Sequence, residues 1–93
     1  MSGPVSVPFN IKRLDAIADR ARARTVQALN GPVEIGDQFF RDLDLRLDSA
    51  VFCFNEARFD HAREHLEAVA VMMLKALYVI DATCPVVPKT DVN

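Results

Sequence analysis

The sequence predicts an all-α fold: a three-helix bundle built on an antiparallel helical hairpin, with extended N- and C-terminal arms. Three observations lead to this fold class. Apolar residues recur at spacings of three and four, the pattern of one helical face, in three separate stretches. Asn30-Gly31-Pro32 ends the first stretch, and Pro85 ends the third. A chain of 93 residues forms one small domain, residues 1–93, and has little room for further elements.

The first helix is expected over residues 11–29. Asn10 is a suitable N-cap, and Phe9 before it can pack against Leu14 in the second turn. Gly31 can adopt the left-handed conformation that follows many helices, and Pro32 cannot continue a helix. Residues 1–9, with two prolines, are expected to form the extended N-terminal arm.

The second helix is expected over residues 37–56, with Asp37 as its N-cap. Its apolar residues alternate spacings of three and four, as in a coiled-coil seam: Phe40, Leu43, Leu47, Ala50 and Phe54. The phase of this pattern slips near residues 57–60. The slip predicts a tight turn, with Asp60 capping a third helix over residues 60–83, although one continuous kinked helix is the alternative. Residues 54–62 loosely resemble the turn of a tetratricopeptide hairpin, which implies an antiparallel pair.

The third helix is the most informative stretch. Between Leu66 and Ile80 only Glu67 and Lys75 are charged, so this helix is apolar on every side. A helix in a small domain needs one apolar stripe, and one that is apolar all round is enclosed by neighbours. Because three helices offer few neighbours, part of this surface is expected to contact another copy of the chain or a different protein.

The apolar pattern also predicts which residues form the core and which form an interface. The predicted core consists of Leu14, Ala18, Phe40, Leu43, Leu47, Phe54, Leu66, Val69, Met73 and Ile80. The predicted interface lies on the opposite sides of the second and third helices, at Leu45, Phe52, Val71, Leu74 and Tyr78. The alternative is that the first helix covers one of these sides.

Charge is distributed unevenly along the chain. The first helix has five basic and two acidic residues, a net charge of +3, whereas the whole chain has a net charge of −2. Arg13, Arg20 and Arg24 share one side of this helix and are a candidate anion-binding row for a nucleotide or nucleic acid. The same arginines can instead pair with acids of the second helix, at Asp42, Asp44 and Asp48. The acidic total disfavours nucleic acid as the main partner.

Two short motifs suggest catalysis. The run from His61 to His65 resembles the H-x-x-E-H zinc motif of the inverzincin peptidases, which implies two histidine ligands with Glu64 as general base. That family also needs a downstream glutamate ligand, and Glu67 is the only glutamate after His65. We therefore expect no metal, no cofactor and no catalytic residue at this motif. Arg58 and His65 resemble the arginine–histidine signature of the HEPN ribonucleases, which implies a dimeric nuclease as a third hypothesis.

The remaining features limit the location and the function class. Within residues 66–80 the longest uncharged run is seven residues, from 68 to 74, against about 20 apolar residues for a membrane span. The first nine residues lack the pattern of a signal peptide, so a cytoplasmic protein with two free thiols, Cys53 and Cys84, is expected. The leading hypothesis is a non-enzymatic, homo-oligomeric interaction module that also binds another protein, as an adaptor, regulator or inhibitor.

Overall fold

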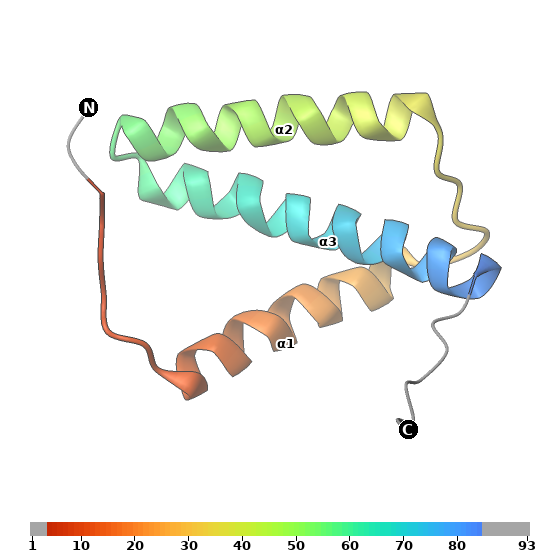
Figure 1. Cartoon of the computed structure of the whole chain (residues 1–93), viewed down its shortest axis with the longest axis horizontal. Coiled ribbons are helices and arrows are strands. Elements are labelled where there is room, and N and C mark those ends of the chain that lie inside the picture. Colours follow the sequence, from red (N-terminus) through yellow and green to blue (C-terminus); the bar gives the residue numbers. More distant parts are fainter. Residues whose placement is uncertain (1–3, 85–93) are drawn as a thin grey trace, which may run out of the picture.

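The computed structural model describes residues 4–84, which form three helices and no β-strand. The helices are α1 (Ile11–Ala28), α2 (Asp37–Asn55) and α3 (Phe59–Thr83) (Figure 1). The predicted all-α, three-helix fold is confirmed, and each helix begins and ends within one residue of its expected bounds. Residues 4–10 lie outside the helices and are exposed, whereas the expected C-terminal arm lies outside the described residues.

At the start of α1 the expected N-cap is confirmed, but the expected contact of Phe9 is not. Asn10 is the N-cap, and its Oδ1 accepts a hydrogen bond from the backbone N–H of Arg13 at 3.0 Å. The expected contact of Phe9 with the helix is wrong, because Phe9 is 77% exposed.

The two aspartates expected to cap the other helices both lie inside them. Gly36 is the N-cap of α2 and Arg58 that of α3, so Asp37 and Asp60 fall in the first helical turns. Carboxylates in a first turn still interact favourably with the positive end of the helix dipole.

The turn between α2 and α3 separates two distinct helices, which confirms the tight turn and excludes one continuous helix. Ala57 has a φ of 59°, in the left-handed region. Two backbone hydrogen bonds close the turn, from Arg58 N–H to the Cys53 carbonyl (2.8 Å) and from Ala57 N–H to the Phe54 carbonyl (3.1 Å). These are the two bonds of a Schellman motif, in which glycine usually occupies the position of Ala57.

Helix α3 is the centre of the fold. It contacts α2 along one side and α1 along the other, and no contact joins α1 to α2, both of which are fully described. Val69 and Val71 are both buried, at 7% and 8% exposure. Residues two apart on a helix point about 200° away from each other, so α3 is covered on opposite sides.

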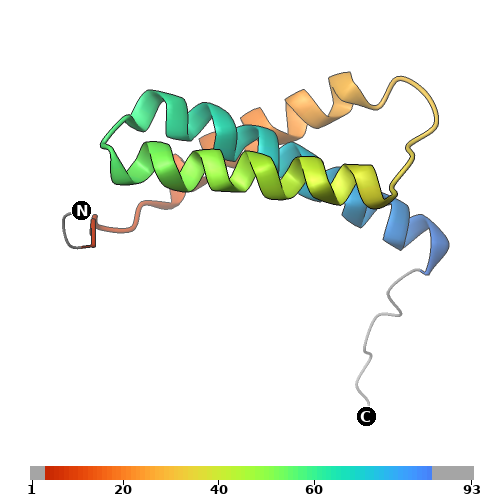
Figure 2. The same cartoon turned by 90° about the horizontal axis from the view of Figure 1, so that it is seen from above.

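The three helices therefore form an open layer, seen face-on in Figure 1 and from the α2 edge in Figure 2. Its principal extents are 45 × 36 × 23 Å.

The interior of this layer is small. The buried apolar residues are Ala21, Ala50, Cys53, Ala62, Val69 and Val71, and no large side chain in the described residues is fully buried. Alanines at the helix contacts allow the backbones to approach closely, but they bury little apolar surface.

The predicted core is wrong for eight of its ten members. Val69 is buried and Leu43 is half-buried, but the other eight are exposed. The physical reason is the position of α1. A core made of these residues requires α1 to pack over the seam between α2 and α3, whereas α1 packs on the far side of α3 and does not contact α2.

Ala57→Gly should stabilise the protein by about 1 kcal/mol, because alanine is strained at a left-handed φ and glycine is not. Ala23, exposed in the middle of α1, provides the matched control. There the same change should destabilise by about 1 kcal/mol, because glycine lowers helix propensity. Urea unfolding at one fixed protein concentration measures both, and a destabilised Ala57→Gly would contradict the strained turn.

Candidate interaction surface

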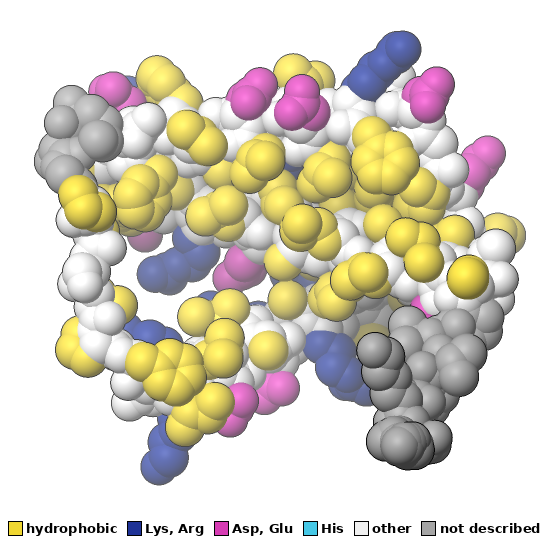
Figure 3. Space-filling view, in the orientation of Figure 1, with side chains coloured by type: hydrophobic (Ala, Val, Ile, Leu, Met, Phe, Trp, Pro, Cys, Tyr) yellow, Lys and Arg dark blue, Asp and Glu magenta, His cyan; other side chains and the backbone are white. Residues whose placement is uncertain are grey.

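One broad side of the helical layer is apolar (Figure 3). We call this side the front face and define it by nine exposed residues that α1, α2 and α3 contribute: Leu14; Phe40, Leu47, Val51 and Phe54; Phe59, Leu66, Met73 and Leu77. On α2 and on α3 these residues recur at helical spacing, so they share one side of each helix. On α3 this side lies between the side that α2 covers and the side that α1 covers. The exposed Glu64 and the half-buried Lys75 point about 180° away from the α3 members, so the opposite side of α3 is polar.

Shallow hollows connect the members of the front face. Val51 and Phe54 of α2 line one hollow together with Leu66 of α3. Phe54 and Leu66 also line the next hollow, which reaches α1. A third hollow, of about 710 Å³, runs between α1 and the second half of α3 and includes Leu14 and Met73. The apolar surface thus continues from α2 to α3, and it reaches α1 along the third hollow. Charged side chains lie in the gap between α1 and the first half of α3 (Figure 3).

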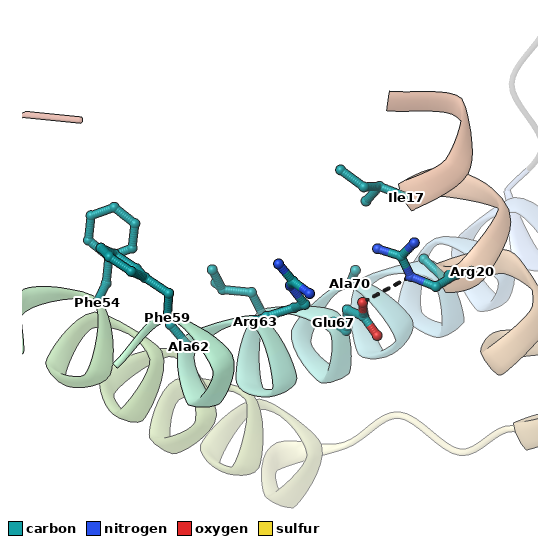
Figure 4. A pocket seen from close by; sticks show the side chains of 10 residues that line it. Ile17, Arg20, Phe54, Phe59, Ala62, Arg63, Glu67 and Ala70 are labelled. Carbon is teal, nitrogen blue, oxygen red and sulfur yellow. Dashed lines mark hydrogen bonds and ion pairs between the residues drawn. The ribbon is translucent and has the colours of Figure 1, made fainter. Parts of the chain in front are cut away.

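The second of these hollows is a cleft of about 300 Å³ between the diverging ends of α1 and α3 (Figure 4). Ile17 lies on its α1 side, and Phe54 and Phe59 lie at its far end, with ring centroids 5.3 Å apart in an edge-to-face arrangement. Arg20 and Arg63 provide positive charge at this cleft.

Glu67 fixes the position of α1 against α3. Its carboxylate accepts hydrogen bonds from Arg20 Nε at 3.3 Å and from Arg24 Nη1 at 3.1 Å. Burial raises the pKa of Glu67, but the hydrogen bonds from Arg24 and Arg20 and their positive charges outweigh burial, so the pKa is lowered below its ordinary value of 4.5. The Glu67 side chain is 19% exposed, and these two ion pairs are the only ones within residues 4–84.

The arginine row predicted to bind anions is divided by this arrangement. Arg20 and Arg24 both bind Glu67, whereas Arg13 is exposed and forms no ion pair with a described residue. The acids that the sequence suggested as partners, those of α2, do not contact α1. Glu67 was missed because it lies within the most apolar stretch of the chain. Its sequence signal was that Glu67 is the only acid between Leu66 and Ile80.

The residues of the predicted interface do not form one surface. Leu45 and Phe52 lie on the side of α2 opposite its front-face residues and are 65% and 57% exposed. Leu45 lines a hollow there between α2 and α3. Val71 is buried on the side of α3 that α1 covers, so it offers little surface to a partner. Leu74 and Tyr78 line the hollow between α1 and α3, at 38% and 58% exposure. Helix α1 thus packs on this side of α3 but leaves Leu74 and Tyr78 exposed.

The two catalytic motifs are not assembled into one site in the described residues. His61 is exposed, whereas His65 is half-buried against α2, beside Ser49 and Met72. Arg58 is exposed at the helical turn and does not line the hollow that contains His65. The His65 Nδ1 is buried and has no hydrogen-bond partner there. No group of three metal-ligating side chains occurs within residues 4–84.

Comparisons with known proteins add no further information: no family model, curated protein or solved structure matches this chain. Among the described residues, no helix combines the length and the apolar character that a membrane crossing requires.

Glu67→Gln should lower the free energy of unfolding by about 1 kcal/mol at neutral pH, because both ion pairs are partly exposed and contribute modestly. A lowered pKa means that this stabilisation is present above pH 4.5 and is lost as the pH falls through the pKa of the folded state. The difference between wild type and variant should therefore shrink below pH 4.5. Chemical unfolding across this pH range measures it.

Glu64→Gln is the matched control, because Glu64 is exposed on the same helix and forms no ion pair with a described residue. It should change stability little at any pH. Equal effects of the two substitutions would show that Glu67 does not hold α1 in place.

Proposed function

We propose that the protein is a small helical interaction module that acts as a homo-oligomer, most simply a dimer, and serves as an adaptor, regulator or inhibitor of another protein. One observation carries the proposal. Twenty large apolar side chains are exposed within residues 4–84, whereas the buried apolar residues are three alanines, one cysteine and two valines. A soluble monomer rarely exposes a contiguous apolar surface of this size unless the surface binds something.

The small interior supports the same proposal. No large side chain in the described residues is fully buried. A domain with so little interior needs a partner to supply the rest of its core.

Anion binding through the arginine row is less favoured, because Arg20 and Arg24 already share one carboxylate. A nuclease or metalloprotein is the least favoured of the three functions. Arg58 does not line the hollow that contains His65, and the Nδ1 atom of His65 is buried. We propose a cytoplasmic location as well, which the two free thiols of Cys53 and Cys84 support.

Static light scattering on the untagged protein tests the proposal. At about 100 µM the measured mass should be at least twice 10.4 kDa, because association removes apolar surface from water. A stable, folded monomer at this concentration would contradict a homo-oligomer.

Nucleic acid is tested on the same sample. Absorbance at 260 nm should show no co-purified nucleotide, and retention on a phosphate matrix should be weak. Strong retention that Arg13→Ala abolishes would favour anion binding instead.

A further inference from the structure

We propose that the front face is the surface on which a second copy of the chain docks, face to face about a two-fold axis that runs along α3. This proposal rests on the proposed function, in which the protein is a homo-oligomer, and it assigns the surface through which the copies associate. That surface differs from the one predicted from the sequence, which included Leu45 and Phe52.

The area of the front face is adequate for a dimer. Its nine residues are between 42% and 59% exposed. If each exposes on the order of 80 Å², about half of a large apolar side chain, the face offers on the order of 700 Å² per copy. Interfaces of standard size bury ≈ 800 Å² per partner, so the front face and its rim reach that range.

The chemistry of the front face suits a second copy in particular. Its nine members are all apolar, so they place no like charges against each other when two copies meet. A two-fold dimer requires a surface that complements itself, and an apolar surface with shallow hollows does so. A second copy is also present wherever the chain folds, and a chain with so small an interior needs its partner at that stage.

The charges at the edges select the direction of the axis. The α2 edge is acidic, since α2 has four aspartates and two arginines, whereas α1 has a net charge of +3. An axis along α3 places the α2 edge of each copy over the α1 edge of the other. A two-fold axis across the helices would instead place acid against acid and base against base. Asp44, beside Phe40 and Leu47, and Arg22, in the hollow with Leu14, are the rim charges that the first arrangement brings toward each other.

Two leucines of α2 provide a matched test of the surface. Leu47 belongs to the front face and is 42% exposed, whereas Leu45 lies on the opposite side of α2 and is 65% exposed. Leu47→Glu should reduce the association constant by about a hundredfold or more, because it places a charge in the apolar contact. Leu45→Glu should leave association unchanged. Sedimentation velocity measures both.

Cysteine labelling decides the case if Leu47→Glu fails to fold. In a Cys84→Ser background, the milder Leu47→Cys and Leu45→Cys are exposed to a maleimide, and peptide mass spectrometry measures each site. Protection of position 47 with rapid labelling of position 45 supports the proposal. Rapid labelling of position 47 in a protein that sediments as a dimer would overturn it.

The remaining outcomes separate this proposal from the proposed function. If Leu45→Glu dissociates the dimer and Leu47→Glu does not, the front face is not the dimer interface. The proposal that the protein is a homo-oligomer would then still stand. A wild-type monomer would overturn both, and would assign the front face to a different protein.

Charge reversal tests the axis separately. Asp44→Lys and Arg22→Glu should each weaken the dimer roughly tenfold, because a two-fold axis repeats each contact twice. The double variant Asp44→Lys/Arg22→Glu should recover most of this loss. A double variant weaker than either single one would overturn the axis along α3.

Discussion

The position of α1 on the far side of α3 is the constraint on which the rest of the structure depends. Had α1 closed over the seam between α2 and α3, residues such as Leu47 and Leu66 would be interior. Because α1 packs opposite α2, the chain forms a layer one helix thick, and that seam remains exposed on the front face. The small interior, the continuous apolar surface and the separation of the acidic and basic edges all follow from this arrangement.

Two kinds of interaction hold α1 in place, and neither is large. Ala21 and Thr25 are buried at the contact with α3, and Glu67 binds Arg20 and Arg24 beside it. Alanine buries little apolar area, and partly exposed ion pairs contribute little. An isolated layer of this kind is therefore weakly stabilised. A second layer over the front face would add to the buried apolar area and would thereby couple the folding of the chain to its association.

The sequence was sufficient for local structure. Helical periodicity, Asn10 and the phase slip near Ala57 predicted three helices and a turn, because these signals depend on residues close together in the chain. It was not sufficient for the core. An apolar stripe predicts that one face of a helix is buried, but not which element covers that face. For this reason Leu47 was predicted to be in the core and is exposed, whereas Val71 was predicted to be at an interface and is buried. The partner of Arg20 was missed similarly, since ion pairing across helices depends on which helices meet.

The most direct test of the account is the dependence of stability on protein concentration. If folding is coupled to dimerisation, a hundredfold increase in concentration adds about 2.7 kcal/mol to the apparent stability. With a urea dependence of roughly 1 kcal/mol per molar, the unfolding midpoint should rise by more than about 1 M. We expect this rise for the wild-type protein. A midpoint that stays constant over the same range of concentration would show that the chain folds as an independent monomer and would contradict it.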